Sequence, residues 1–499
     1  MAAESYSYNF FREDLQAQSD SENPDIKKTL WLSSQFKLSS LKFRLREDPR
    51  SYPALGKGIS DIASDGSNIN GSLVVGSIVD LNNLLKRNPK IATKIRSAFG
   101  GGGVDLVSGG PPCQSFSMAG LRKQDCEKNN LPWEFAKFAE TIQPKLILLE
   151  NVTGILRPFK DEQGNSYYAW LEVAKGFSSI GYIPLCLHVN AKFAGVPQNR
   201  PRFILIGVRK DFFNKLTPTF NKEERELFAQ PLEFFNRTNN GAEIELNSLR
   251  YRDVSNPADL LLFKNSFLKS LVLYTDKFVT VSNAIDDLRN NGDTKATFPK
   301  NLSVIFSKVL PKHKMRNHEH RTNSDLVRRR FRIYQVLQQV DNATHKQVLS
   351  ILKGEANELS TSDWKQLAGF EYLIESGKFH TFKSKAMFLA FLKRHPTKKQ
   401  TQKALLANQP APAALSIPDD GCHYHHNEQR TLTVREMARI QSFPDEFEFR
   451  SKITTGGKMR SFEVPQYTQV GNAVPPLLAR TLGIAVTDLL ARVKSSTHS

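Results

Sequence analysis

The sequence predicts an α/β protein built on a doubly wound, mostly parallel sheet, with a second domain inserted into it. Short apolar runs bounded by proline or polar residues are typical of strands that are buried on both faces. Segments with helical spacing lie between these runs, and this alternation indicates βα units. The alternation stops at about residue 211 and is lost until about residue 420, which indicates an insertion.

The elements of the α/β domain are expected between residues 71 and 210. Residues 1–70 are mixed and weakly periodic, so we expect an N-terminal extension or a poorly ordered lead-in there. A short buried strand and turn are expected at 72–81, and further buried strands at 104–110, 144–152 and 202–210. Helices are expected at 134–142 and at 167–182, and the second should end near Gly181.

The insertion, 211–420, contains charged segments, a basic stretch at 308–332 and a Pro-rich linker at 408–420. After the linker, 421–499 is expected to return to the first domain. The segment TVREMARIQSF at 433–443 predicts an amphipathic helix. The segment AVPPLLARTLGIAVTDLLARV at 473–493 predicts a final helix with proline near its first turn.

Composition narrows the class of protein. The 499 residues are enough for two or three domains. A formal charge of +19 indicates a polyanionic partner, and nucleic acid is the natural one. The four cysteines form no Cys-x-x-Cys pair, which favours a reducing, cytoplasmic location over a disulfide framework or a zinc site. We predict no membrane span and no secretory signal, since no run of about 18 apolar residues occurs.

The most specific signal is GGPPCQSFSMAG at 109–120, where Cys113 follows a strand end on a turn of two glycines and two prolines. In open α/β sheets, ligands bind beyond the carboxyl ends of the strands. A thiol held there, near a helix start, can have a lowered pKa and act as a nucleophile. The alternative is a buried, inert cysteine, but a Pro-Pro-Cys-Gln turn is a poor place for core packing.

Three further groups of residues point to the same edge of the sheet. Glu150 ends the next buried strand, and its carboxylate should lie beside the Cys113 loop, where it could hold or supply a proton. Arg200 and Arg202 flank a proline and form two cationic forks that suit a phosphate or a base oxygen. The turn in QYTQVGNAVPPLLAR (466–480) opens a helix with free backbone N–H groups. Taken singly, each has a plain alternative: a solvent-facing glutamate, an exposed basic turn and an ordinary helix start.

Together these motifs resemble the cytosine-5 DNA methyltransferase family of restriction–modification type. That family carries a Pro-Cys-Gln loop, a Glu-Asn-Val strand end, a Gln-x-Arg-x-Arg element, an Arg-Glu…Arg-x-Gln-x-Phe-Pro helix and a Gly-Asn-x-Val-Pro-Pro turn. All five occur here in the family's order, over about 105–210 and 425–495. The resemblance implies a Rossmann-like, S-adenosylmethionine-dependent methyltransferase fold with a target-recognition domain in the long gap.

The resemblance also implies a substrate, a cofactor and roles for residues. Double-stranded DNA would be the substrate and S-adenosyl-L-methionine the methyl donor. Cys113 would attack C6 of a flipped cytosine, Glu150 would contact the ring N3 and the exocyclic amine, and Arg202 with Arg200 would hold the base and the loop. The positions that match the family's cofactor side are Pro112, Leu131, Asn472 and Val474. Those that match the loop closing over DNA are Gln114, Ser115 and Ser117.

One family element is missing before Cys113: an opening strand with Phe-x-Gly-x-Gly-Gly and an acidic residue about 20 positions later. The run FGGGG at 99–103 precedes a strand instead of following one, so we expect a loop there. VVGSIVDL resembles the family's Gly-Asp-Ile element, but Ser77 replaces the acid, and Asp80 is a candidate substitute. Three explanations compete: a second polypeptide that supplies the Gly-rich motif, a gene whose start was lost or mis-assigned, and a pseudo-enzyme that keeps DNA binding. Cys113, Glu150 and Arg202 are intact, which argues against a pseudo-enzyme, and of the three explanations we favour the first.

The basic stretch suggests how the insertion contacts DNA. Arg328, Arg329 and Arg330 predict phosphate contacts, against the alternative of a solvated helix face. Residues 379–403 interleave aromatic residues with lysines and are a second candidate. The histidines at 318, 320, 423, 425 and 426 have no cysteine or carboxylate at ligand spacing, so we predict no metal site.

Two rival functions stay open. One is a tRNA cytosine-5 methyltransferase of the same fold, although the Cys-Phe-Thr signature of that branch is not found in this sequence. The other is a non-catalytic DNA-binding module.

Overall fold

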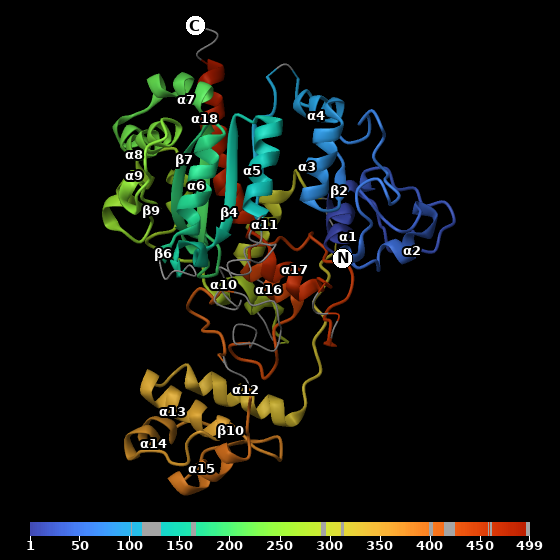
Figure 1. The fold of residues 1–499 in the computed structure, drawn as a ribbon. Coiled ribbons are helices and arrows are strands. Elements are labelled where there is room, and N and C mark those ends of the chain that lie inside the picture. The colour runs from blue at the N-terminus through green and yellow to red at the C-terminus, as the bar shows by residue number, and fades with distance from the viewer. Residues whose placement is uncertain are drawn as a thin grey trace. The chain divides into compact units, whose positions relative to one another are not determined.

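The computed structural model describes residues 1–100, 102–111, 131–160, 166–290, 296–310, 314–398, 403–413, 425–457, 459 and 462–495. These residues form two compact units, whose elements are labelled in Figure 1. The sheet unit comprises Tyr6–Gly195, Arg200–Asp276 and Leu477–Ser499. The helical unit comprises Met1–Ser5, Val196–Asn199 and Lys277–Pro476.

A five-stranded sheet in the order β3-β4-β8-β7-β9 forms the centre of the sheet unit. Its strands are β3 (Leu106–Gly109), β4 (Leu146–Val152), β8 (Pro201–Arg209), β7 (Tyr182–Asn190) and β9 (Arg252–Asp253). The strands predicted at 104–110, 144–152 and 202–210 are confirmed as β3, β4 and β8. The prediction of a mostly parallel sheet is confirmed, since β3, β4, β7 and β9 run in one direction and β8 runs antiparallel to its neighbours β4 and β7. The connection at 191–200 is too short for a parallel return, which needs a crossover of about a dozen residues or more.

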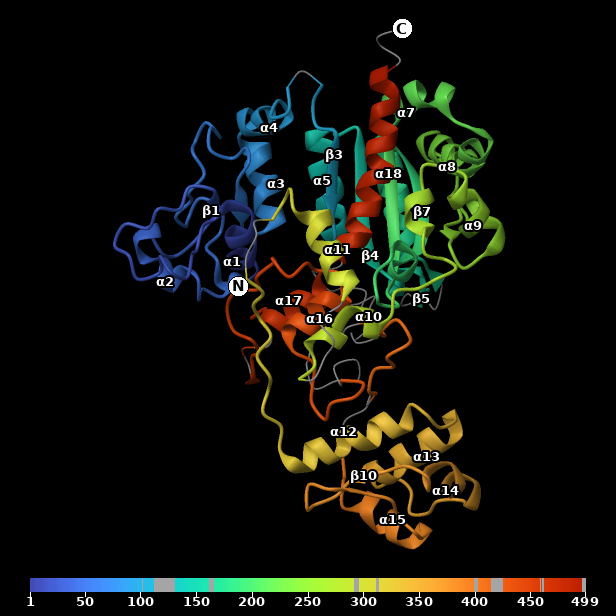
Figure 2. The same ribbon diagram turned by 180° about the vertical axis from the view of Figure 1, so that it is seen from behind.

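Helices cover both faces of this sheet, as a doubly wound fold requires. α5 (Leu131–Ile142) and α6 (Ala169–Ser179) lie on one face, and α18 (Pro476–Ser495) lies on the other (Figures 1 and 2). The helices predicted at 134–142 and 167–182 are confirmed as α5 and α6. The core that α5 and α6 share with the sheet includes Phe135, Ala139, Ile147, Leu149, Trp170, Phe177 and Phe203.

The predicted final helix at 473–493 is confirmed as α18. By length and apolar composition alone, Gln466–Val493 is the one candidate for crossing a membrane in the described part of the chain. In the structure this segment is two helices, α17 (Gln466–Asn472) and α18. Leu478, Leu482 and Leu489 of α18 are buried. The candidate is therefore weak, because the segment is divided into two helices and several of its apolar residues are buried in the protein.

The N-terminal part of the sheet unit is folded, which corrects the prediction of an extension or a poorly ordered lead-in at 1–70. β1 (Thr29–Trp31) pairs in parallel with β2 (Leu73–Val75), and α2 (Leu41–Arg44) lies between them in sequence. Leu15, Ile26, Trp31 and Leu41 are buried together in a small core. The irregular spacing of these residues along the chain hides the core from a periodicity analysis.

The chain after β2 is helical, where the sequence predicted a turn. α3 (Ile78–Arg87) and α4 (Pro89–Arg96) follow β2 directly. Ser77 caps α3, because its hydroxyl accepts a hydrogen bond from the backbone N–H of Val79 at 3.2 Å. The loop expected at 99–103 precedes β3, and its described residues belong to no helix or strand.

Residues 211–276 fold with the sheet unit, so the units divide near residue 276 and not at the predicted residue 210. This segment contains nearly all of α7 (Lys210–Leu216), followed by α8 (Lys222–Asn239), β9 and α9 (Pro257–Lys264). β9 extends the sheet beside β7. A strand of two residues leaves no periodicity to read. The same unit holds β5 (Phe159–Lys160), which pairs in antiparallel fashion with β6 (Ser166–Tyr167).

The described residues of the helical unit form two hydrophobic cores. One joins α12 (Asp325–Leu337), α13 (Asn342–Lys353), α14 (Thr361–Leu367), α15 (Lys385–Lys393) and β10 (Tyr372–Leu373), and β10 pairs with β11 (Phe379–His380). The other includes α10 (Val281–Ile285), α16 (Val434–Ile440) and α17. The unit also holds α11 (Thr297–Phe306) and most of α1 (Ala2–Tyr6). The helix predicted at 433–443 is confirmed as α16. It folds with this unit, although 421–499 was expected in the first domain.

Candidate active site

A buried ion pair marks the carboxyl end of β4. The register pairs Val152 with Arg202 and Glu150 with Ile204, so Glu150 and Arg202 are diagonal neighbours on one face of the sheet. Arg202 Nε lies 2.7 Å from Glu150 Oε1, and the two side chains are 10% and 16% exposed. Burial lowers the pKa of Arg202, while the nearby Glu150 carboxylate opposes that shift. The arginine thus fixes the position of the carboxylate.

The backbone that leads to Cys113 passes directly beside this carboxylate. β3 and β4 are parallel, and Gly109 pairs with Leu149. A Cβ added to Gly110 would lie 3.2 Å from Glu150 Oε2, so glycine permits the close approach. Asn151 Nδ2 donates a hydrogen bond of 3.2 Å to the carbonyl of Pro111. The entrance of the loop is therefore fixed next to Glu150. Cys113 itself, with Pro112, Gln114, Ser115 and Ser117, lies outside the described residues.

Arg200 lies in the turn between β7 and β8. Its backbone N–H donates to Asn190 Oδ1 at 3.1 Å, and its carbonyl accepts from the N–H of Ala191 at 3.1 Å. Its side chain is only 3% exposed. The sequence predicted two equivalent cationic forks, but the structure gives the two arginines different surroundings, with Arg202 alone paired to Glu150 in an ion pair.

Cys186 is a buried cysteine whose surroundings do not favour a reactive thiolate. It lies on β7 with no exposed surface, and burial raises the pKa of its thiol. It is the free cysteine of the described residues.

The predicted cofactor residues are spread over both units. Leu131 is the first residue of α5 in the sheet unit and is half-buried. Asn472 is the exposed last residue of α17, and half-buried Val474 follows it in the helical unit. Asp80, the candidate substitute for the missing acid, lies in the first turn of α3. A carboxylate there complements the helix dipole.

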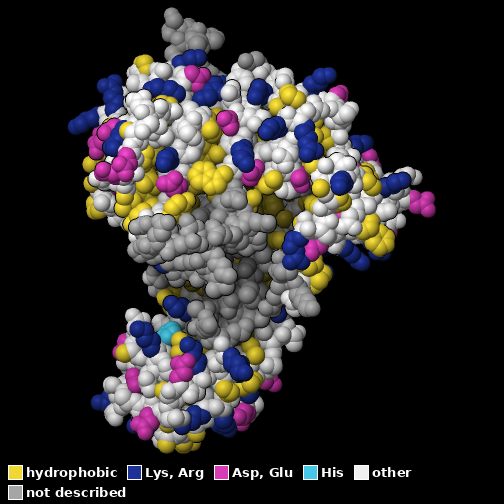
Figure 3. Space-filling view, in the orientation of Figure 1, with side chains coloured by type: hydrophobic (Ala, Val, Ile, Leu, Met, Phe, Trp, Pro, Cys, Tyr) yellow, Lys and Arg dark blue, Asp and Glu magenta, His cyan; other side chains and the backbone are white. Residues whose placement is uncertain are grey.

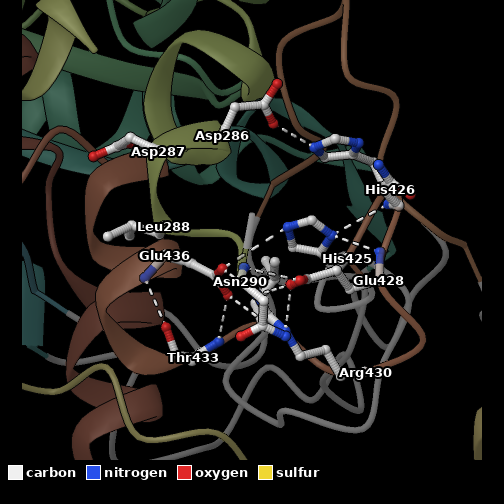
Figure 4. Close-up of polar contacts among 12 residues, drawn as sticks. Asp286, Asp287, Leu288, Asn290, His425, His426, Glu428, Arg430, Thr433 and Glu436 are labelled. Atoms are coloured by element: carbon white, nitrogen blue, oxygen red, sulfur yellow. Dashed lines mark hydrogen bonds and ion pairs between the residues drawn. The ribbon is translucent and has the colours of Figure 1, made fainter. Parts of the chain in front are cut away.

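The helical unit contains a buried polar network around α16, for which the sequence predicted only an amphipathic helix (Figure 4). Glu436 accepts two hydrogen bonds of 2.7 Å from Arg430 and also caps α16 through the N–H of Thr433. Arg435 is fully buried and donates to the carbonyls of Arg316, Pro444 and Phe447, and burial lowers its pKa to about 10. The Arg-Glu pair of the motif at 433–443 therefore organises the core of this unit.

The histidines of this region are engaged in hydrogen bonds. His426 Nε2 lies 2.7 Å from Asp286 Oδ1, and His318 Nε2 lies 3.2 Å from the carbonyl of Leu288. His425 Nδ1 accepts from the N–H groups of Asn427 and Glu428, which fixes its tautomer. Burial, followed by the nearby charge of Arg430, lowers the pKa of His425 to about 2. His423 lies outside the described residues.

The predicted DNA-contacting arginines lie on α12 and are not equivalent. Arg328 is exposed and lies 3.5 Å from Asp325. Arg329 Nε donates to His395 Nε2 at 3.0 Å, and Arg330 donates to the carbonyl of Pro396. In the second basic segment, at 379–403, Phe382, Phe388 and Phe391 are buried core residues. On the face that Figure 3 shows, Lys and Arg side chains are scattered among acidic ones and do not gather into one patch.

Known proteins resemble the chain over most of its length. The sequence model of the family described as C-5 cytosine-specific DNA methylase matches residues 82–487. The type II methyltransferase M.DdeI of Desulfomicrobium norvegicum is 27% identical over 382 residues, which cover 76% of this chain and 71% of that protein. M.AgeI of Thalassovita gelatinovora is 26% identical over 410 residues, covering 78% and 84%. The solved structure of the S. pombe Dnmt2 methyltransferase is 14% identical with a TM-score of 0.33, covering 86% of this chain and 90% of that one.

Proposed function

The chain belongs to the C-5 cytosine-specific DNA methylase family and is a DNA cytosine-5-methyltransferase, and we propose that it acts through a covalent bond between Cys113 and C6 of a flipped cytosine. The observation that carries this proposal is the Glu150–Arg202 ion pair beside the backbone at Gly110 and Pro111. A nucleophile three residues beyond Gly110 and a carboxylate fixed at the neighbouring strand end suit attack on a pyrimidine ring.

The residues of the chain would divide the chemistry as follows. The Cys113 thiolate adds to C6, so a C–S bond forms and the electrons of the C5–C6 double bond make C5 nucleophilic. Glu150 holds N3 and the exocyclic amine of the flipped base, and Arg202 holds the Glu150 carboxylate. Arg202 with Arg200 also holds the base and the loop. After C5 has been substituted, loss of its proton and elimination break the C–S bond and release the thiolate. Cysteine suits both steps, because a thiolate is a good nucleophile and a good leaving group.

Members of this family use S-adenosyl-L-methionine as the methyl donor. We propose Pro112, Leu131, Asn472 and Val474 as the residues of this chain on the donor's side. The loop that follows the N-terminal strand β1 contains no glycine and does not fit the donor. We therefore propose a split enzyme, in which a second polypeptide supplies the Gly-rich motif.

We propose double-stranded DNA as the substrate, with Gln114, Ser115 and Ser117 closing over it in the cytoplasm of a prokaryote. The helical unit would hold the target-recognition surface. Of the three arginines proposed for phosphate contact, Arg328 has the exposed side chain, whereas Arg329 and Arg330 also hold α12 to His395 and Pro396. Arg328 is thus the best placed of the three to neutralise a phosphate.

Release of tritium from DNA labelled at C5 of cytosine tests the covalent step without a methyl donor. Reversible addition of the thiolate at C6 lets C5 take up a solvent proton, and loss of the tritium with elimination of the thiolate restores cytosine. The chain should release tritium, Cys113→Ser should not, and Cys186→Ala should behave like the parent because Cys186 is a core residue on β7.

The same assay separates the rival functions. Absence of tritium release, with DNA binding intact, would favour a non-catalytic DNA-binding module. Release from labelled tRNA in preference to DNA would favour the tRNA-modifying rival.

A further inference from the structure

The loop that follows β1 lacks what a nucleotide-binding loop needs. In α/β proteins, such ligands sit beyond the carboxyl end of a strand, on a glycine-rich loop at the N-terminus of a long helix. Here Leu32–Ser40 contains no glycine, and α2 (Leu41–Arg44) has only four residues. So short a helix offers no N-terminal site for an anion.

The exits from β1 and β2 also leave no crevice between them. Leu32 and Gly76 follow the last paired residues of the two strands. A Cβ added to Gly76 would lie 2.7 Å from the Cβ of Leu32, which shows that the two exits are in direct contact. A Cβ added to Gly58 would lie even closer to the Oγ of Ser33. The space where a ligand would lie between parallel strands is therefore filled by the chain itself.

The backbone N–H groups of this loop are already bonded within the chain. The N–H of Ser34 donates to the carbonyl of Ile59 at 3.0 Å, and the N–H of Gln35 donates to Glu47 at 2.8 Å. The N–H of Phe36 donates to the hydroxyl of Ser34 at 3.1 Å. In a ligand-binding loop such groups would point to the ligand. Here they hold the loop closed.

A buried ion pair between Arg44 and Asp61 stabilises the closed loop after β1. Asp61 Oδ2 accepts from Arg44 Nη1 at 2.7 Å and from the N–H of Trp31 at 2.9 Å. The Arg44 side chain has no exposed surface, and its guanidinium lies over the Trp31 ring, 4.9 Å from its centroid. Asp61, which lies 30 residues after Trp31, is therefore committed to Arg44 and Trp31 and is not available to a ribose.

The residues that follow β2 give independent evidence that the donor is not bound here. Ser77 stands where the family's acid is expected, and its hydroxyl caps α3. The family match begins only at residue 82, after all of these residues. On the assumption that the proposed function is right, we infer that residues 29–77 form a closed module that holds no methyl donor. Methyl transfer then requires that S-adenosylmethionine be held by residues outside this module, which we assign to a second polypeptide.

Binding of the donor to the purified full-length chain tests this inference. Equilibrium dialysis with radiolabelled S-adenosylmethionine should show no saturable binding at millimolar concentrations, and S-adenosylhomocysteine should leave the melting temperature unchanged. Bound ligand at 100 times its Kd would stabilise the fold by about 2.7 kcal/mol, a shift that thermal denaturation detects easily. A relative that carries the glycine-rich loop serves as the positive control.

Two readouts distinguish failure of this inference from failure of the proposed function. Saturable donor binding, or methyl transfer by the purified chain alone, would overturn the inference and leave the covalent mechanism standing. Loss of donor-free tritium release would overturn the covalent mechanism instead. Restoration of methyl transfer by a second purified polypeptide that binds the donor on its own would support the inference.

The variant Asp61→Asn gives a sharper check on the closed module. If Asp61 stabilises the closed module through Arg44 and Trp31, the variant should show faster hydrogen exchange at residues 30–36. Neither the parent chain nor the variant should then bind the donor. If Asp61 is a ribose ligand, the parent chain should bind the donor and the variant should lose that binding by 10-fold or more, roughly the worth of a hydrogen bond to a charged group.

Discussion

Replacing Glu150 with glutamine removes the charge that Arg202 depends on while keeping the shape of the side chain. The two side chains are 16% and 10% exposed, and their atoms lie 2.7 Å apart, so the variant leaves a guanidinium buried without its counter-charge. Breaking a buried pair costs about 3–5 kcal/mol, and the residual exposure of both groups favours the lower end, about 3 kcal/mol. Loss of a positioned proton donor or acceptor should slow cytosine activation by about 10²–10⁴-fold.

Two assays follow the effects of Glu150→Gln. Hydrogen exchange at β4 and β8 reports local stability, which suits a chain with two units better than a single melting temperature. Donor-free tritium release reports activation of the base. The matched control is Asp211→Asn, just beyond the other end of β8, where the Arg209–Asp211 pair has side chains 30% and 59% exposed. It should cost less than about 1 kcal/mol and leave tritium release unchanged. Equal protection at β4 and β8 in Glu150→Gln and the parent, with full tritium release, would refute the reasoning.

Four further predictions concern single residues. In the presence of the donor-binding polypeptide, Cys113→Ser should abolish methyl transfer but keep DNA affinity in a gel-shift assay, and retained methylation would contradict the assignment of Cys113 as the nucleophile. Arg328→Ala should reduce the slope of log affinity against log salt by about 0.9 without loss of stability. Arg329→Ala should instead loosen α12, because its side chain binds His395, and equal salt slopes for the two variants would contradict this division. The helical unit should lose about 2 kcal/mol of stability between pH 6.5 and pH 5. Burial lowers the pKa of His425 to about 2, so in that range only the unfolded chain takes up a proton at this residue. Denaturant titrations of His425→Gln should therefore show a weaker dependence of stability on pH.

The sequence predicted much of the sheet unit because its signals are local. The apolar runs at 104–110, 144–152 and 202–210 became β3, β4 and β8, since a strand buried on both faces needs continuous apolar residues. The Pro-Cys-Gln and Glu-Asn-Val motifs predicted that Glu150 should lie beside the Cys113 loop. The described entrance of that loop, at Gly110 and Pro111, does lie beside Glu150.

The partner of Glu150 could not be predicted in the same way. Arg202 lies 52 positions later, and its place depends on β8 running antiparallel to β4. A parallel β8 would have placed Arg202 at the far edge of the sheet. The roles of Arg329 and Arg330 were hidden for a similar reason, since His395 and Pro396, which they contact, lie 66 residues further along the chain.

By itself, the sequence determined the order of the motifs, the strands with continuous apolar runs, the capped and amphipathic helices and the excess of positive charge. These follow from interactions within a few residues of the chain, so periodicity and turn chemistry reveal them. Only the tertiary structure decided the direction of β8, the Glu150–Arg202 pair, the division near residue 276 and the closure of β1 by Arg44 and Asp61. Each of these depends on contacts between distant segments, whose free energy arises from packing and buried charge that no local pattern records.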